Sequence, residues 1–529
     1  MALPNRDNPY SFEPFLRRRD SFDYYADDAF LQRLVRHHAG ESWEAVHARL
    51  LAFSRRVSFR WRELAEISSL PDMRPRLMHF DGHGNRIDRI VRPRETAVLE
   101  REIAAEGLFC ERTPRWERLT KQLLLHQNGE AGVLCALACT EGLISLVEQY
   151  TGAVDPSVER ALRHCREGID GDFGLGSQFL TEAQGGSDVA ANRVEAEPDG
   201  DHYRLFGVKF FCSACHTDYA LVTAKVTGSE DVSTFLVPTW LPGDKARERR
   251  NGHVLRRLKR KLGTIELPTA EIEYTGAVAY PVGPLGRGIS NIVGHVLTVS
   301  RINVAIGAAA SALRAAREAR MYAEFRTVFE RPVADYPLAA HQLEELERTA
   351  RRTAAGLYQI HAELLAVDAR LTAGLPRDDD IDARRRKLRI RMLIMLQKIV
   401  TMRDAIDSLR LAMSLFGGHG VMECFSALPR LLRDAMINEQ WEGPRNLLLA
   451  QIHRDLQRIA DWYPPRELAA DLVPDAPTSL AAELEHFTRS DVFDAQPGAA
   501  SMAQARQWDR FAQALLHAYQ EAALIRLSD

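Results

Sequence analysis

What the sequence lacks narrows its class before any motif is considered. The seven cysteines are an odd and scattered set among 529 residues, which suits a reducing compartment better than a disulfide scaffold. The N-terminus, MALPNRDNPYSFEPFLRRRD, has no apolar run, so we do not expect a secretory signal. No apolar stretch approaches the roughly 18–20 residues of a membrane span, and we find no internal repeat. We therefore expect a cytoplasmic protein without a membrane partner.

The chain also lacks a strong charge of either sign. Its formal net charge is −3, which gives no overall attraction to nucleic acid or to a membrane surface. The apolar content of 46% and the charged content of 27% are typical of globular proteins. At this length we expect two to four domains.

Hydrophobic periodicity indicates helices on both sides of a β domain. Apolar residues recur at helical spacing before residue 170, and short alternating runs with Gly, Asp and Pro then predict an antiparallel sheet at 177–280. Prolines 464, 465, 474 and 477 predict a break before a last helical segment. The predicted helical stretches are 27–59, 95–170, 291–328, 337–371, 384–416, 430–460 and 499–526, with a polar turn at 81–85. The predicted units are an N-terminal extension (1–90), a helical domain (91–176), a β domain (177–283), a helical bundle (284–458) and a helical tail (459–529).

One carboxylate stands out in the stretch Pro429–Asp455. Glu442 lies between Trp441 and Gly443, directly before a strongly apolar helical run. An aromatic wall beside a carboxylate suits a desolvated base, because burial raises the pKa of Glu toward neutrality, where proton abstraction is most efficient. Taken alone, the same string also fits a solvated Glu at a helix start.

Two glycine-rich stretches are candidate binding elements. In Phe179–Asn192, the pair Gly185-Gly186 allows backbone amides to approach a planar or anionic ligand, and Thr181 and Ser187 offer hydroxyls. The stretch Ser414–Gly420, SLFGGHG, is a second glycine turn. A plain turn and a plain break between helices are the alternatives.

The motifs resemble the acyl-CoA dehydrogenases when they are taken together. The resemblance covers roughly residues 100–455, and it is strongest to the longer, AidB-like branch of that family. It rests on the ordered strings TEAQGGSD, KFFCS, SRINVAIG, RTVF, FGGHG and PRLLRDAMINEQWEG.

The resemblance implies a mainly α, α+β fold. Its parts are an N-terminal helical domain, a central antiparallel β-barrel and a C-terminal four-helix bundle, here with added N- and C-terminal segments. It also implies an FAD-binding homo-oligomer, usually a tetramer.

The resemblance assigns roles to residues by position. Glu442 matches the catalytic base, and Arg301, Trp441 and Gly443 match substrate-binding positions. Phe211 replaces a more usual Trp beside the flavin ring, and Ser213 replaces a Thr near flavin N5. The positions that it assigns to FAD are Thr181, Ser187, Phe211, Ser213, Arg326, Phe329, Gly417, Gly418 and Asn446. No metal is implied.

Four departures from the family pattern touch these positions. Glu330 stands where Gly is usual, Ser414 where Gln is frequent, and Pro444 where Thr or Ser is frequent. Ile265-Glu266-Leu267 replaces a basic or small polar run. The first three concern FAD contacts, and the last concerns the entrance for substrate.

The implied activity is FAD-dependent α,β-dehydrogenation of an acyl-CoA or an acyl carrier thioester, with an electron-transferring flavoprotein as acceptor. The sequence does not specify the acyl chain. One alternative is an AidB-like, DNA-associated stress-response flavoprotein with residual dehydrogenase activity, and another is a flavin oxidase or monooxygenase on the same fold.

Three further patterns bear on these alternatives. Cys212–His216 has the C-x-x-C-H spacing of a haem site, but it falls inside a flavin-contact segment. Basic runs at 245–261 and 384–391 suit phosphates, or else solvated faces and ion pairs. The tail from Leu456 to Asp529 has eleven acidic residues against six arginines, which disfavours DNA contact there. Its apolar stripe predicts packing on its own subunit or on a partner.

Overall fold

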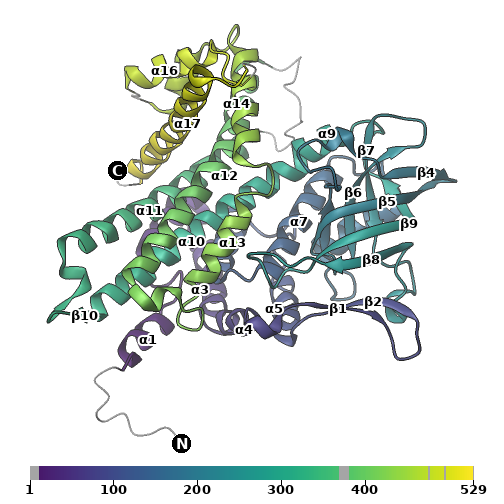
Figure 1. Cartoon of the computed structure of the whole chain (residues 1–529), viewed down its shortest axis with the longest axis horizontal. Helices are drawn as coiled ribbons and strands as arrows, with labels where there is room; N and C mark the ends of the chain where they lie inside the picture. Colours follow the sequence, from purple (N-terminus) through teal and green to yellow (C-terminus); the bar gives the residue numbers. More distant parts are fainter. Residues whose placement is uncertain (1–10, 368–379, 475–476, 494–495, 528–529) are drawn as a thin grey trace, which may run out of the picture.

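The computed structural model of the chain joins a large helical part to a β domain (Figure 1). The structure describes residues 11–367, 380–474, 477–493 and 496–527. Long helices occupy one side of the molecule, the sheet lies on the other, and the C-terminal helices stand on the helical part. The order that the sequence predicts, helices, a β domain, a second helical region and a helical tail, is present in the structure.

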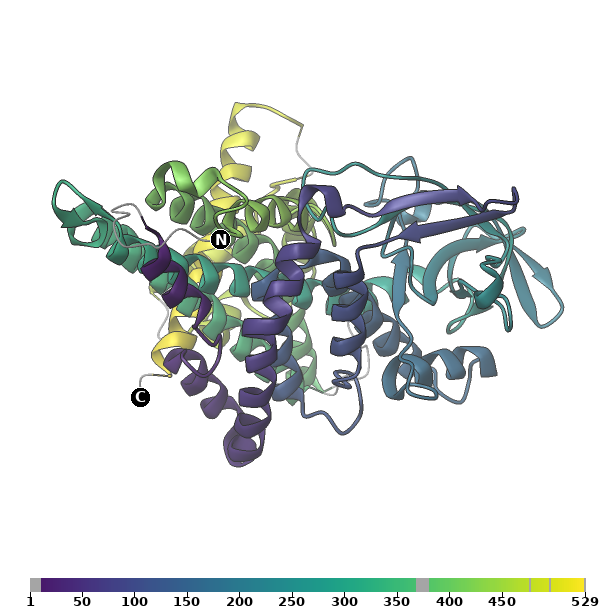
Figure 2. The ribbon, with the colours of Figure 1, turned by 90° about the horizontal axis from the view of Figure 1, so that it is seen from below.

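The N-terminal region is helical apart from one hairpin. The side chain of Asp28 accepts a hydrogen bond from Leu31 N and so caps α2, and Asp155 caps α8 in the same way through Ser157 N. The predicted polar turn lies in the hairpin, which runs beside the β domain (Figure 2). The elements are α1 (Glu13–Asp20), α2 (Ala29–Ala39), α3 (Trp43–Arg55), α4 (Arg62–Ser68), β1 (Arg76–Phe80), β2 (Arg86–Val91), α5 (Arg94–Ala104), α6 (Arg115–Asn128), α7 (Ala131–Glu148) and α8 (Pro156–Glu167).

The β domain forms a closed ring of strands. Its strands are β3 (Gly176–Phe179), β4 (Glu195–Asp199), β5 (His202–Ser213), β6 (Tyr219–Val226), β7 (Val232–Pro238), β8 (His253–Leu258) and β9 (Thr269–Pro281). The strand path β6-β4-β5-β9-β7 returns to β6 through the β6–β7 pair, so the barrel is closed. The prediction of a purely antiparallel sheet is wrong, because β3 and β4 each pair with β6 in parallel.

The second helical region contains the longest helices. They are α9 (Gly288–Asn291), α10 (Leu297–Phe325), α11 (Pro337–Ala366), α12 (Ile381–Leu415), α13 (Leu428–Asn438) and α14 (Arg445–Ile459), with a short hairpin of β10 (Thr327–Val328) and β11 (Arg331–Pro332) after α10. The prediction of one helical stretch at 430–460 is wrong, because residues 439–444 separate α13 from α14. The last four residues of the predicted stretch 337–371 lie outside the described residues.

The tail adds three helices, α15 (Pro465–Leu472), α16 (Thr478–Thr488) and α17 (Ala499–Ile525). Pro465 begins α15 and Pro477 directly precedes α16, so these prolines start helices that the sequence interpretation missed. The apolar stripe of α17 packs on its own chain, where Trp508 Nε1 donates to Leu449 O at 3.2 Å.

Two core helices correct the expectation about apolar runs. Ala131–Glu148 and Gly288–Phe325 are long and apolar enough to cross a membrane by length and composition. In their most apolar windows, 78% and 72% of the residues are buried inside the protein. Core helices pass the same test, so it is weak support for a membrane span.

Candidate active site

Glu442 lies in the loop that separates α13 from α14. Its backbone has a φ of 58°, in the left-handed region, and Gly443 follows with a φ of 98°. A side chain at Gly443 would place its Cβ 3.0 Å from Leu448 Cδ2, so both conformation and space favour glycine there. For Glu442, which is not a glycine, the left-handed conformation costs about 1–3 kcal/mol. It persists only because the surrounding structure stabilises it.

Two buried cations hold this loop through its carbonyl groups. Arg301 Nε on α10 donates to Glu442 O at 3.0 Å. Lys398 Nζ on α12 donates to Glu439 O at 2.6 Å and to Gly443 O at 2.8 Å. Both side chains come from long helices, so the position of the loop is fixed by the bundle.

Among the residues that the structure describes, the carboxylate of Glu442 receives one hydrogen bond, and its environment is desolvated. Gln178 Nε2, on β3, donates to Glu442 Oε1 at 3.1 Å. Burial raises the pKa of Glu442 above the usual range for Glu, although Arg301, Lys398 and the Gln178 bond act to lower it. The structure therefore holds a carboxylate that is a stronger base than an exposed Glu.

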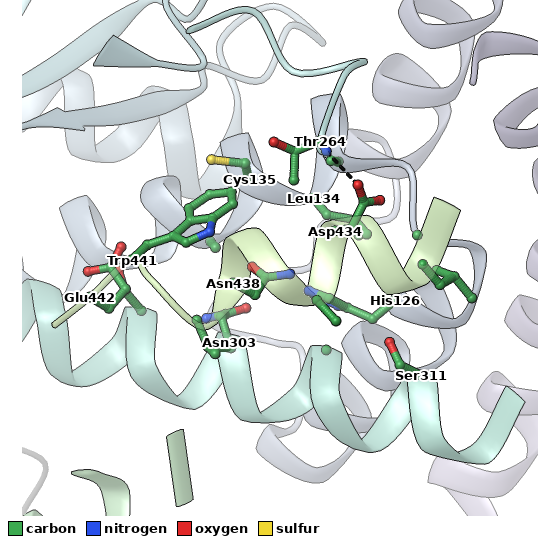
Figure 3. Close-up of a pocket in the computed structure, with 18 of the residues that line it drawn as sticks. His126, Leu134, Cys135, Thr264, Asn303, Ser311, Asp434, Asn438, Trp441 and Glu442 are labelled. Atoms are coloured by element: carbon green, nitrogen blue, oxygen red, sulfur yellow. Dashed lines mark hydrogen bonds between the residues drawn. The ribbon is translucent and has the colours of Figure 1, made fainter. Parts of the chain in front are cut away.

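A cavity of about 90 Å³ begins at Glu442 and extends between α10 and α13 (Figure 3). Trp441 forms part of its wall beside the carboxylate, and Cys135 and Cys139 on α7 also line it. Its other lining residues come from α6, α7, α10, α13 and the loop at Thr264. The Glu442 carboxylate therefore lies where it can contact a ligand bound in the cavity.

Four predicted FAD-binding residues gather at one edge of the β domain. Thr181 O accepts a hydrogen bond from Phe210 N at 2.9 Å, which joins the glycine motif after β3 to strand β5. Ser213 Oγ lies 3.1 Å from Thr269 Oγ1, and Ser187 is exposed. Phe211 is 51% exposed, at a point where the β5–β9 pairing is irregular. An exposed aromatic ring with nearby hydroxyls suits the flat, polar-edged ring of a flavin.

A buried ion pair holds this glycine motif in place. Lys209 Nζ donates to Glu182 Oε1 at 2.7 Å, and both side chains are almost fully buried. Glu182 also accepts hydrogen bonds from the backbone N–H groups of Arg193 and Val194. Gly186 is required here, because a Cβ would lie 2.6 Å from Thr181 Oγ1.

Four more predicted FAD-binding residues lie at the opposite end of α10. Arg326 and Phe329 belong to the β10–β11 hairpin, and Gly417 and Gly418 begin the turn after α12. Tyr322 Oη lies 2.9 Å from His419 Nδ1, which joins the hairpin end of α10 to this turn. Phe329 is 89% exposed, and no atom lies within 4 Å of a Cβ built at either glycine.

One chain cannot bring the two groups of FAD residues together. Ser300 and Phe325 are about 38 Å apart along α10 at a rise of about 1.5 Å per residue. Figure 1 shows the β10 end of α10 and the β domain on opposite sides of the molecule. Asn446, the last predicted FAD residue, is exposed in the first turn of α14, close in sequence to Glu442.

Several residues that contact the site were not predicted from the sequence. Gln178 directly precedes the glycine motif, and its contact with Glu442 requires the packing of β3 against the bundle. Lys398 is a single cation in the apolar run IMLQKIV, a signal that points to a buried role. His126 and Asn438 line the cavity, yet neither belongs to a motif.

The cysteines and the histidine of the C-x-x-C-H string, and many cations of the two basic runs, are buried or paired with other side chains of the protein. In the C-x-x-C-H string both cysteines are buried, and His216 Nε2 lies 3.0 Å from Glu100 Oε2. Within the described parts of the chain, no cluster of three or more His, Cys, Asp or Glu residues could hold a metal ion. Many cations of the basic runs pair with nearby acids: Arg256–Glu273, Arg257–Glu271, Lys259–Glu271, Arg385–Glu467, Arg389–Asp471 and Arg391–Asp455.

Comparisons with known proteins agree with this architecture. Residues 177–277 match the middle domain of acyl-CoA dehydrogenases, and residues 286–457 match their C-terminal domain. Acyl-CoA dehydrogenase family member 11 of Caenorhabditis elegans is 30% identical over 452 residues, which cover 81% of this chain and 70% of that protein. AidB of Escherichia coli is 29% identical over 489 residues, covering 88% of this chain and 82% of AidB.

Solved structures share the fold. The Caenorhabditis elegans protein in complex with C11-CoA has a TM-score of 0.78 at 25% identity, covering 96% of this chain and 90% of that chain. An acyl-CoA dehydrogenase of Bacillus anthracis complexed with FAD has a TM-score of 0.61 at 18% identity, covering 82% of this chain and 76% of that chain. The chain therefore belongs to the acyl-CoA dehydrogenase family of FAD-dependent oxidoreductases, and to its AidB-like branch.

Proposed function

We propose that this protein catalyses the α,β-dehydrogenation of an acyl thioester, with Glu442 as the base that removes the α-proton. The observation that carries the proposal is the desolvated Glu442 carboxylate at the end of the cavity, in a loop clamped by Arg301 and Lys398. A raised pKa makes this carboxylate a better proton acceptor near neutral pH.

The thioester is held so that its α-proton becomes acidic. The backbone N–H of Glu442 donates to no other group among the described residues, so it is free to donate to the thioester oxygen. Such a donor stabilises the negative charge that develops on that oxygen. Trp441 and Gly443 flank the base, and a substrate bound in the cavity would exclude water from its carboxylate.

FAD is the cofactor that we assign to the edge of the β domain. Thr181, Ser187, Phe211 and Ser213 would hold its ring, and bound FAD supplies the acceptor for the β-hydride. The groups at Arg326, Phe329, Gly417 and Gly418 are too distant in the same chain, so they would contact the FAD of a second copy. A homo-oligomer, in the family commonly a tetramer, accounts for their exposure.

We assign the remaining partners by the same family analogy. An acyl-CoA or an acyl carrier thioester is the substrate, and an electron-transferring flavoprotein is the electron acceptor. The cytoplasm is the expected location, and all seven cysteines are free thiols, as in a reducing compartment.

The second candidate is the alternative that the family resemblance left open, an AidB-like, DNA-associated flavoprotein with residual dehydrogenase activity. The local ion pairs of both basic runs weaken it, because paired cations attract phosphate less strongly. A gel shift with duplex DNA at low salt separates the two functions, since binding through phosphates is strongest there. Rapid reoxidation of the reduced protein by air would instead favour a flavin oxidase or monooxygenase.

The test compares the wild-type protein with Glu442→Gln after anaerobic mixing with a panel of acyl-CoAs. Loss of the base should slow flavin bleaching by about 10²–10⁴-fold while FAD remains bound. Glu439→Gln, in the same loop, is the matched control and should bleach at the wild-type rate. Equal rates in wild type and Glu442→Gln would remove Glu442 from the mechanism.

A further inference from the structure

The part of the cavity away from Glu442 has polar side chains where an acyl chain would lie. Along α10, Ser300, Asn303, Gly307 and Ser311 share the lining face, which extends about 16 Å at a rise of about 1.5 Å per residue. Asn438 on α13 and His126 on α6 face the same space, and Figure 3 shows them between Glu442 and Ser311. Ser300 bonds to Gln178 and Asn303 bonds to Glu141, so these two have roles within the protein. An apolar chain alone would not need the polar groups of His126, Asn438 and Ser311.

The protonation of His126 can be assigned from its contacts. Its Nδ1 lies 2.8 Å from Gln122 O, and because a carbonyl only accepts, Nδ1 carries the proton. Burial lowers the pKa of His126 to about 4, so the ring is neutral near pH 7. Nε2 is therefore a hydrogen-bond acceptor, and it makes no hydrogen bond with any described residue.

Space beside this acceptor is kept open by a glycine. A Cβ at Gly307 would lie 3.3 Å from His126 Cδ2 and 4.0 Å from Nε2, so a larger residue would crowd the imidazole edge. Neither the amide of Asn438 nor the hydroxyl of Ser311 makes a side-chain hydrogen bond within the described residues. The cavity thus presents one fixed acceptor and two groups that can donate or accept.

We infer that the substrate is an acyl thioester whose chain carries a hydroxyl group remote from the thioester, bound by His126, Asn438 and Ser311. This inference rests on the proposed function, because it places the thioester at Glu442. The hydroxyl donates to His126 Nε2 and accepts from the Asn438 amide. It thereby satisfies groups that an unsubstituted chain would leave buried without partners.

The expected selectivity follows from these two hydrogen bonds. Each neutral hydrogen bond contributes a few-fold in affinity, so together they should favour the hydroxylated chain about tenfold. A site built to bind a hydroxyl also discriminates against the analogue that lacks it, since its polar groups remain unpaired.

Calorimetric titration of the FAD-loaded protein tests this inference without relying on turnover. The probes are matched pairs of acyl-CoAs, from hexanoyl to dodecanoyl, each unsubstituted and with an ω-hydroxyl. We expect the hydroxylated member of the best-fitting pair to bind about tenfold more tightly. His126→Phe and, independently, Asn438→Leu should each reduce that ratio toward one. Met436→Leu, at an exposed position on the same helix, should keep it.

The outcomes separate the inference from the function on which it rests. Equal or tighter binding of the unsubstituted chain at every length overturns the inference, even if that chain bleaches the flavin. Preferential binding of the hydroxylated chain without bleaching supports the assigned ligand and contradicts the dehydrogenase function. A wild-type ratio in correctly folded His126→Phe and Asn438→Leu, checked by thermal melting, also overturns the inference.

Discussion

The two ends of helix α10 differ in how many of the nearby functional residues have contacts within the same chain. At the Glu442 end, side chains from three elements, Gln178, Arg301 and Lys398, converge on one loop. At the hairpin end, Phe329 is 89% exposed with a φ of 48°, and Gly417 and Gly418 have open space around them. A bulky aromatic residue rarely adopts a left-handed backbone conformation. A phenylalanine side chain that is so exposed is also unusual unless a partner covers it.

This contrast is what we expect if roles are divided between copies of the chain in the proposed oligomer. The acid–base half of the site is preorganised inside one chain, where rigid helices hold the base. The hairpin half is preorganised for contact with something outside that chain. We therefore expect substitutions at the first end to change chemistry or folding, and those at the second to change FAD retention.

The largest effect on stability should come from Lys209→Met. This change leaves the Glu182 carboxylate buried without its cation, which costs about 3–5 kcal/mol. Urea unfolding measures it. Lys225→Met is the matched control on strand β6 of the same barrel: its partner Glu230 is exposed, so unfolding should hardly change. Equal effects of the two substitutions would mean that the buried pair has no special role in anchoring the glycine motif.

Arg326→Ala should produce a smaller effect, confined to the cofactor. Loss of a charge-assisted contact to FAD weakens its binding about 10- to 100-fold. FAD content after gel filtration and a fluorescence titration measure this. Arg331→Ala, in the same hairpin, removes a cation that instead donates to Asp335 O within its own chain. If both variants lose FAD equally, the effect comes from damage to the hairpin.

Lys398→Met should shift a pH profile. The Lys398 cation lowers the pKa of Glu442, so its removal raises that pKa further. Because the base must be deprotonated, the rise of kcat/KM with pH should move to higher pH. Lys398→Arg keeps the charge and should restore the wild-type profile. An unchanged profile in Lys398→Met would show that the two charges do not interact.

The sequence was informative where function depends on local strings and uninformative where it depends on packing. The order of motifs predicted the family fold, which is confirmed, and a catalytic role for Glu442, which stays a prediction. The same region was predicted as one helix, because the left-handed backbone of Glu442 has no local signature. Arg301 was assigned to substrate, whereas the structure shows its guanidinium bound to Glu442 O. Gln178, Lys398 and His126 come from separate elements, so only the fold brings them to one cavity.

The central claim is that each site combines Glu442 of one copy with the Arg326 hairpin of another. Co-assembly of Glu442→Gln chains with Arg326→Ala chains tests it most directly, at an FAD concentration that leaves Arg326→Ala unloaded. Each parent should be almost inactive in anaerobic bleaching by acyl-CoA. The account predicts restored bleaching in the mixed oligomers, because some sites then receive both native residues. Activity no higher than the sum of the separate parents would contradict it.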